Sequence, residues 1–131
     1  MPEFEEVRRK FKQDRFATDR TGIVIDSVGD KYSKCSFEVC EHHLNAMNGV
    51  MGGAIFTLAD YTFAVAANSD GRNIVSVSST VNFLRPGICS KLIAEARCIK
   101  DGKSTCFYEV TVCDEAGKQI AAVSFTGYVI K

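Results

Sequence analysis

The most distinctive pattern in the chain is a long apolar run between two polar loops. Residues 53–68 carry an apolar side chain at almost every position and leave almost no polar face. A helix with this pattern is expected to be buried on all sides. The run stops at Asn68-Ser69-Asp70-Gly71, which contains good helix-ending residues. The pattern therefore predicts a central helix over 53–68.

A shorter amphipathic helix is predicted near the N-terminus. Phe4, Val7 and Phe11 recur at helical spacing, and basic side chains occupy the other faces. The pattern extends to Phe16. We assign the N-terminal helix to residues 1–20 and expect it to lie on the surface of the domain.

The remaining segments have the composition and the turns of β-strands. Two strands are predicted before the central helix and four after it: Ile23–Val28, Tyr32–Cys40, Ile74–Leu84, Lys91–Lys100, Ser104–Cys113 and Gln119–Ile130. Asp101-Gly102 is the strongest hairpin signal in the chain. An antiparallel sheet has one apolar face to bury, and the apolar helix must bury its surface against another element. We therefore predict an α+β fold with about six strands curled around the helix.

Alternation within the predicted strand 74–84 separates two kinds of side chain. One face carries the apolar residues Val75, Val77, Val81 and Phe83. The other carries the small polar residues Ser76, Ser78, Thr80 and Asn82. A solvent face would normally carry Lys or Glu, so the hydroxyl face predicts a ligand cleft or, as the alternative, a polar interface alone.

Length and charge narrow the class of protein. The 131 residues fit one domain, 1–131, that buries its own core. Sixteen basic and sixteen acidic residues cancel, so charge does not point to nucleic acid or a membrane surface. No apolar run reaches the roughly 18–20 residues of a membrane span, and residues 1–12 lack the apolar region of a signal peptide. We expect a cytoplasmic protein.

The six cysteines show neither a Cys-x-x-Cys pair nor the Cys/His spacing of a zinc site. Most lie in strand-like runs, where a free Cys serves as a small buried apolar side chain. A catalytic or redox role is the alternative, but it needs a base near the thiol, and both histidines, His42 and His43, sit in one loop. No metal or redox cofactor is implied.

Asp60 is the anomaly of the central helix. Apart from Tyr61, it is the only ionisable side chain between Gly52 and Ser69. Asp is a poor helix former, and a buried carboxylate costs several kcal/mol unless it is paired. We interpret Asp60 as a catalytic group. The alternative is a helix face that opens to solvent or to a partner subunit.

A glycine-rich loop precedes this helix. Gly49, Gly52 and Gly53 leave the amides at the helix N-terminus unobstructed, and these amides have no intrahelical partner. Such a helix end polarises a carbonyl and holds a developing oxyanion. Asp60 lies about two turns further along the helix, too far to act at the amides of its own helix end. A partner chain's carboxylate reaches them if the helices of a dimer are antiparallel.

The residues around Asp60 also match a known motif. The pattern combines His43-x-Asn45, Gly49, Gly52-Gly53-Ala54 and Leu58-Ala59-Asp60. It resembles the signature of hotdog-fold acyl-CoA thioesterases, in particular the PaaI-like branch that includes the mammalian thioesterase superfamily member proteins. The similarity continues through 64–69 and 82–87 and spans 41–131 in element order.

This resemblance implies a function and a site. It implies hydrolysis of an acyl-CoA thioester, with Asp60 as general base or nucleophile and the Gly53 amide polarising the carbonyl. Asn45 would help to place the carbonyl or water, and Ser76 would orient the attacking water. The residues implied to contact substrate or CoA are Met51, Gly52, Ser78, Phe83, Arg85, Lys100, Lys103 and Ser104. CoA enters as part of the substrate. The site lies between the subunits of a dimer, which often joins into a tetramer.

One position departs from the family pattern. Relatives usually have His-Gly-Gly at the start of the helix, where this chain has Met51-Gly52-Gly53. The missing histidine predicts weaker catalysis or a different substrate, and His43 or His42 is a candidate to replace it. Two alternatives remain. One is a non-catalytic module that binds acyl-CoA or another ligand, and the other is a hotdog hydratase, whose Asp/His spacing residues 42–45 do not reproduce.

Overall fold

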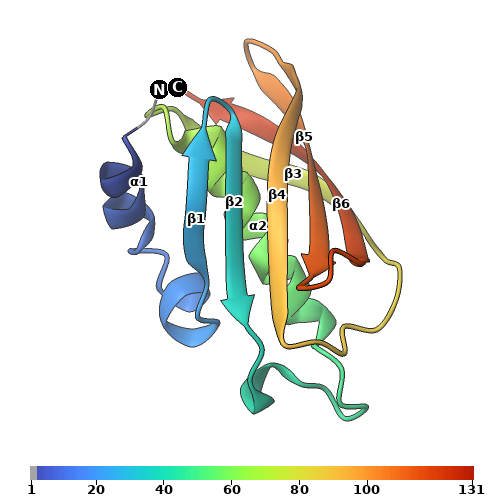
Figure 1. The fold of residues 1–131 in the computed structure, drawn as a ribbon. Coiled ribbons are helices and arrows are strands. Elements are labelled where there is room, and N and C mark those ends of the chain that lie inside the picture. The colour runs from blue at the N-terminus through green and yellow to red at the C-terminus, as the bar shows by residue number, and fades with distance from the viewer. Residues whose placement is uncertain (1–2) are drawn as a thin grey trace.

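The protein is an antiparallel sheet with one long helix packed across it (Figure 1). The computed structural model describes residues 3–131. The elements are α1 (Phe4–Phe11), a π-helical turn η1 (Phe16–Arg20), β1 (Val24–Gly29), β2 (Tyr32–Glu38), a 3-10 turn η2 (Glu41–His43), α2 (Gly52–Asn68), β3 (Asn73–Phe83), β4 (Lys91–Asp101), β5 (Thr105–Asp114) and β6 (Gln119–Ile130). The strand order is β1-β2-β4-β5-β6-β3. The predicted α+β fold and its six strands are confirmed.

The apolar helix α2 supplies the core, and it packs mainly against β2 and β4. Leu58, Ala59 and Val65 are fully buried. Phe63 stacks on Phe125 with ring centroids 4.6 Å apart and meets Tyr108 edge-on at 5.3 Å. The helix begins at Gly52, one residue before the predicted start.

The expectation that α2 is buried on all sides is wrong for one strip. Gly53 is exposed, and Phe56, Thr57, Asp60 and Ala64 are only partly buried. These positions recur at three- and four-residue spacing, so they share the face of the helix that points away from the sheet. The residues of this face are mostly apolar or small, which is why the pattern alone did not reveal it.

The predicted N-terminal helix over 1–20 is interrupted. Its first two residues lie outside the described part of the chain, and α1 ends at Phe11. The next two helical positions that should be apolar, Asp14 and Arg15, are polar, so no stripe remains to be buried. Thr18 Oγ1 donates a hydrogen bond to the Lys12 carbonyl at 3.0 Å, which takes the place of a helical bond to that carbonyl.

A β-bulge in β3 changes the faces of this strand. The register with β6 shifts between Ser76 and Ser78, and Val77 is the extra residue. An inserted residue reverses the faces of all later positions. Ser76 pairs with Gly127, which faces the core, since a Cβ there would meet Phe63 Cζ at 3.1 Å. Ser78 lies on the opposite face of the sheet.

The predicted faces of strand 74–84 are therefore wrong in part. Val81 and Phe83 pair with the buried residues Val123 and Ala121 and face α2, whereas Val75 pairs with the exposed Tyr128 and faces away. The bulge itself leaves no mark in the sequence, because apolar and small polar residues still alternate from Val75 to Ser78, where the register shifts.

The strand β3 ends the sheet, and β6 is the one strand that pairs with it in the described part of the chain. Ile74 is the one fully buried residue among its eleven. An edge of this length with unpaired backbone groups is a template for another strand. Among the described residues, no helix is long and apolar enough to cross a membrane.

Candidate active site

Asn45 holds the loop that leads into α2. Its Oδ1 accepts hydrogen bonds from the amides of Met47 (2.9 Å) and Gly49 (3.1 Å), and its own amide donates to the Gly49 carbonyl at 2.8 Å. The side-chain oxygen is therefore used by the loop. The Nδ2 group finds no acceptor within residues 3–131, so it is the part of this exposed side chain that is available to a ligand.

His43 is buried behind this loop and is held as one tautomer. Its Nδ1 accepts from the Cys40 amide at 3.0 Å, and its Nε2–H donates to the Thr21 carbonyl at 2.8 Å. The ring also packs on Phe37, with centroids 4.4 Å apart. With both nitrogens engaged, His43 does not replace the missing histidine at the helix start. His42 is exposed at the surface.

The amides of Gly52 and Gly53 are free at the start of α2. The Met51 carbonyl accepts from the amides of Ala54 (2.9 Å) and Ile55 (3.1 Å), whereas those of Gly52 and Gly53 find no acceptor in the part of the chain that the structure describes. They point their partial positive charge outward, as expected at a helix N-terminus. This end of α2 therefore offers two donors to an anion or a polarised carbonyl.

Space around the two glycines differs. A Cβ on Gly53 would meet no atom within 4 Å, whereas a Cβ on Gly52 would lie 3.1 Å from Phe83 Cζ. The fold itself thus gives a steric reason for Gly52 but none for Gly53. The open space at Gly53 is where a ligand can approach the backbone.

Asp60 is half-buried on the same face of α2. Within residues 3–131 it forms no hydrogen bond and no ion pair. Burial raises the pKa of this carboxyl above its ordinary value, and the nearby negative charge of Asp14 raises it further. An unpaired carboxylate whose basicity is increased by its surroundings is suited to accept a proton.

Gly53 and Asp60 are seven residues apart and face the same way. At a rise of 1.5 Å per residue, their separation along the helix axis is roughly 10 Å. The donor and the carboxylate of one chain therefore cannot act on the same atom. Thr57 lies between them on this face, and its Oγ1 donates to the Gly53 carbonyl at 2.7 Å. The sequence analysis did not single out Thr57, although its four-residue spacing from Gly53 already places it on this face of the helix.

The predicted site residues fall into two groups at opposite ends of β3. Asn45, Met51, Gly52, Phe83 and Arg85 lie at the Gly53 end. Met51 is 58% exposed, so its side chain is open to a ligand. Arg85 Nη1 donates to the Gln119 carbonyl, which ties the guanidinium to the end of the sheet.

Lys100, Lys103 and Ser104 lie at the other end, around the β4–β5 hairpin. The Ser104 carbonyl accepts from the amide of Val129, which pairs with Ile74 at the start of β3. Ten residues of extended strand separate Asn73 from Phe83, or roughly 33 Å. The single chain thus does not bring these residues to Gly53, and Ser76 and Ser78 lie nearer to the hairpin end on opposite faces.

The cysteines carry no sign of nucleophilic chemistry. Cys35 and Cys106 are buried, and Cys40 is exposed. Burial raises the pKa of Cys35 to about 12, and it also raises the pKa of Cys89, Cys98, Cys106 and Cys113. These thiols are protonated at neutral pH and serve as small apolar side chains. Residues 3–131 contain no group of three or more His, Cys, Asp or Glu placed to hold a metal ion.

Comparison with known proteins identifies the family. Residues 47–121 match the Thioesterase superfamily. The acyl-coenzyme A thioesterase PaaI of Escherichia coli is 35% identical over 101 residues, which cover 76% of this chain and 72% of PaaI. The chain belongs to the thioesterase superfamily. It is a thioester hydrolase of the PaaI-like branch.

Several solved structures agree with this fold. The structure of E. coli PaaI matches with a TM-score of 0.84 at 29% identity and covers 95% of this chain and 96% of PaaI. A Streptococcus mutans protein bound to acetyl CoA matches with a TM-score of 0.79 at 29% identity, covering 82% and 88%. The PaaI protein of Thermus thermophilus matches at 0.81 and 26% identity, covering 86% and 97%. The hotdog fold expected from the motif is confirmed.

Proposed function

We propose that this thioesterase hydrolyses acyl-CoA to a free acid and CoA at a site shared by two copies of the chain. The observation that carries the proposal is the arrangement on α2, where the Gly53 amide and the half-buried Asp60 have no partner within residues 3–131 and share one face but lie roughly 10 Å apart. The two groups complement each other only when they come from different chains.

The free edge of β3 supports a pairing that brings them together. Gly52 lies against Phe83 at the end of β3, and Asn68 bonds Ile74 near its start, so α2 and β3 run in opposite directions. Two copies joined edge to edge by antiparallel β3 strands form an isologous dimer. In that dimer, the start of α2 in one chain lies toward the end of α2 in its partner.

The same pairing unites the two groups of predicted binding residues. Lys100, Lys103 and Ser104 sit at the start of β3, and the antiparallel partner offers its Gly53 end there. Lysine side chains at the mouth of this cleft suit the phosphates of CoA. The acetyl CoA found on the S. mutans protein supports CoA as the ligand class. The reaction as proposed needs no metal or redox cofactor, because CoA arrives as part of the substrate.

The chemistry follows from the two groups. The Gly53 N–H donates to the thioester carbonyl and stabilises the oxyanion that forms on it. In one route Asp60 of the partner subunit takes a proton from water, the water oxygen bonds to the carbonyl carbon, and the C–S bond breaks to release the CoA thiolate, which takes the proton back from Asp60. In the other, the Asp60 oxygen itself attacks, CoA leaves as thiolate and takes a proton from water, and water then hydrolyses the acyl–aspartyl anhydride to the free acid and the Asp60 carboxylate. Asn45 and Ser76 are proposed to place the carbonyl and the water.

Replacement of Asp60 by asparagine tests the proposal. Asp60→Asn keeps the shape of the side chain but loses the base, so thiol release from short, aromatic and long acyl-CoAs should fall by about 10²–10⁴-fold. Asp26→Asn, at an exposed position on β1, is the matched control and should keep wild-type turnover. Retained activity of Asp60→Asn, with unchanged oligomer size, would refute the role of this carboxylate.

Labelled water separates the two routes. During turnover in water that contains heavy oxygen, attack of water on the aspartyl carbon of an anhydride transfers the label into Asp60, and mass spectrometry of the peptide detects it. Label in Asp60 therefore identifies the anhydride route, since neither general-base catalysis nor attack of water on the acyl carbon puts label there.

The residue at position 51 favours one alternative function, that of a module that binds acyl-CoA without cleaving it. The exposed Met51 side chain has no hydrogen-bond donor where relatives usually place a histidine. Saturable acyl-CoA binding without thiol release from any member of the panel would support this rival, and activity gained by Met51→His would then mark a lapsed enzyme.

A further inference from the structure

Two large apolar side chains are exposed beside the start of α2. Met51 is 58% exposed and Ile88 is 74% exposed. A single exposed apolar side chain is common on protein surfaces, whereas a contiguous group of them marks a binding surface. Met51 lies in the loop that leads into α2 and Ile88 in the β3–β4 loop, and Figure 1 shows these two loops at the same end of the sheet. We call these two residues the Met51–Ile88 patch.

Val50 and Gly87 join the two loops. The Val50 amide donates a hydrogen bond to the Gly87 carbonyl at 3.0 Å. Val50 is buried, and a Cβ on Gly87 would lie 3.3 Å from the Val50 Cβ, so both positions face the interior. Met51 and Ile88 are the next residues in their loops, and their exposure shows that both turn outward from this junction.

Gly49 leaves room for the two side chains to form one surface. A Cβ on Gly49 would lie 4.0 Å from Ile88 Cγ1, so Ile88 covers this glycine. Residues 49–51 are extended, since the Gly49 carbonyl and the Met51 amide bond the facing segment 43–45 at 2.8 Å each. Side chains two residues apart in an extended segment point to the same side. Met51 therefore projects on the side of Gly49 that Ile88 covers.

The helix gains no stabilisation from the side chain of Met51. This residue is the N-cap of α2, a position where Ser, Thr, Asp or Asn accepts a hydrogen bond from an amide of the first turn. The Met51 side chain makes no such bond, and the Gly53 amide is left without an acceptor within residues 3–131. An unbranched, adaptable apolar side chain therefore lies two residues from the proposed carbonyl donor.

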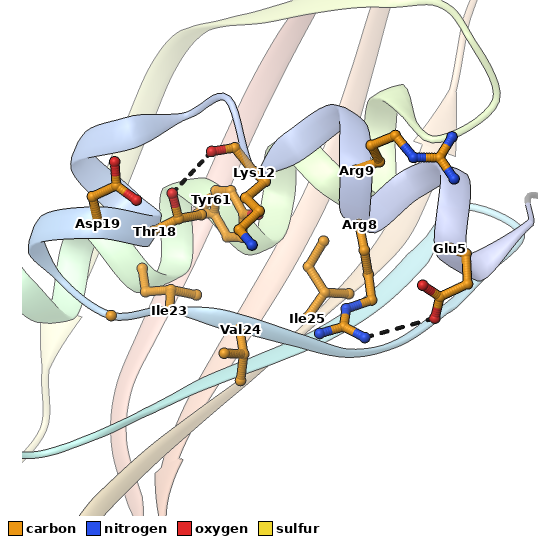
Figure 2. A pocket seen from close by; sticks show the side chains of 11 residues that line it. Glu5, Arg8, Arg9, Lys12, Thr18, Asp19, Ile23, Val24, Ile25 and Tyr61 are labelled. Carbon is orange, nitrogen blue, oxygen red and sulfur yellow. Dashed lines mark hydrogen bonds and ion pairs between the residues drawn. The ribbon is translucent and has the colours of Figure 1, made fainter.

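The hollow between α1, η1 and β1 offers no comparable surface (Figure 2). Ile23, Ile25 and Tyr61 line it but are only 2%, 6% and 4% exposed, so they present little apolar contact to a ligand. Cations and carboxylates share its rim, where Arg8 lies 3.6 Å from Glu5. Exposed apolar surface for a ligand is found at the start of α2 instead.

The chemistry of the patch suits a hydrocarbon chain. Neither side chain carries a charge, so the patch does not attract the phosphates of CoA. The amide and the carbonyl of Met51 are already bonded within the chain, so they are not available to the amides of the pantetheine arm. A hydrocarbon chain needs neither kind of partner and is stabilised by the burial of its surface.

We propose that the Met51–Ile88 patch binds the acyl chain of the substrate and makes the enzyme prefer unbranched aliphatic acyl groups, such as octanoyl, over acetyl. This inference rests on the proposed function, because it places the thioester carbonyl at the Gly53 amide. The carbonyl carbon bears the sulfur of CoA on one side and the acyl chain on the other. With CoA drawn toward Lys100 and Lys103 of the partner subunit, the acyl chain extends over the patch.

Binding of CoA thioethers to the whole protein tests this subsite. S-ethyl-CoA and S-octyl-CoA lack the scissile carbonyl, so calorimetric titration measures their affinities whether or not the protein hydrolyses thioesters. Burial of one methylene is worth about fourfold in affinity, so S-octyl-CoA should bind at least about tenfold more tightly than S-ethyl-CoA. Equal affinities for the two thioethers would overturn the proposal.

Alanine variants locate the preference. Met51→Ala and Ile88→Ala should each lower the octyl-to-ethyl affinity ratio by at least about threefold and leave the affinity for S-ethyl-CoA unchanged. Alanine is chosen at position 51 because a serine would cap the first turn and compete for the Gly53 amide. Val24→Ala, at a half-exposed apolar position on the opposite edge strand β1, is the matched control and should keep the wild-type ratio. All three positions are exposed, so the variants are expected to fold.

The other outcomes each have a distinct meaning. Equal weakening of both thioethers by Met51→Ala would assign the patch to the pantetheine arm and overturn the acyl subsite. An unchanged ratio would also overturn it, and a smaller oligomer in the same variants would then assign the patch to contact with a second copy. Absence of thiol release from both acetyl-CoA and octanoyl-CoA by the wild-type protein would refute the proposed function, while the thioether ratios still decide whether the patch binds the chain.

Discussion

Replacing Gly53 by alanine separates stability from activity at the proposed carbonyl site. A Cβ at Gly53 meets no atom within 4 Å, so the folded chain accepts it without a clash. In a helix, alanine is favoured over glycine by roughly 0.5–1 kcal/mol, and the lower value applies in the first turn. For 131 residues the unfolding entropy is roughly 0.28 kcal/mol/K, so the melting temperature should rise by about 2 °C.

The same methyl group occupies the space through which a thioester carbonyl approaches the Gly53 amide. Loss of one such donor typically costs about 10²–10³ in rate, and we expect kcat/KM for acyl-CoA to fall by about that factor. Calorimetry and a thiol-release assay on the same preparation measure both effects. Gly29→Ala in β1 is the control for an added methyl group away from the site, since its Cβ would make only ordinary contact with Tyr32 at 3.6 Å. Wild-type kcat/KM in Gly53→Ala would refute carbonyl binding at this amide.

Burial and Asp14 raise the pKa of Asp60, so ionisation of this carboxyl destabilises the fold. Asp60→Asn should therefore have a higher melting temperature than wild type at neutral pH, and this difference should vanish below about pH 3.9, where the carboxyl is protonated in both the folded and the unfolded state. The kcat/KM of the wild-type enzyme should rise with pH, with a midpoint above about pH 3.9. Asn68→Ala should lower the free energy of unfolding by about 1–3 kcal/mol in urea melts, since the amide bonds both backbone groups of Ile74. Gly127→Ala should also lower the free energy of unfolding by about 1–3 kcal/mol, because the added Cβ would lie 2.7 Å from Cys106 Sγ. An Asn68 or Gly127 variant as stable as wild type would contradict the packing described.

The fold was predictable because its main signals are local. The apolar run at 53–68 specifies the central helix, and the Asp101-Gly102 turn specifies one hairpin. The antiparallel sheet follows because the remaining strands are the elements against which the apolar helix can be buried. The bulge at Val77 was not predictable, because it depends on how β3 meets β6, a non-local contact. The early end of α1 has a local cause: Asp14 and Arg15 interrupt the apolar stripe, and Thr18 Oγ1 bonds the Lys12 carbonyl six residues away.

The candidate site was predictable to the level of individual residues only where chemistry contradicts local preference. Asp60 stands out because a carboxylate has no local reason to lie on an apolar helix, and in the structure it is half-buried and has no partner among residues 3–131. The role of Asn45 Oδ1 in the loop and the engagement of both His43 nitrogens could not be read from the sequence, because they depend on backbone groups brought close by folding. In the proposed site, the assembly of Gly53 with a carboxylate needs a second chain, which the pattern of one chain does not position.

Complementation between two inactive variants tests the shared site most directly. Asp60→Asn and Gly53→Ala chains with different tags are co-expressed, and dimers that carry both tags are purified. In such a dimer, one site combines the intact Gly53 of one chain with the intact Asp60 of the other, so turnover per dimer should recover to about half of the wild-type value. Doubly tagged dimers no more active than the two variants alone would contradict a site formed by both chains.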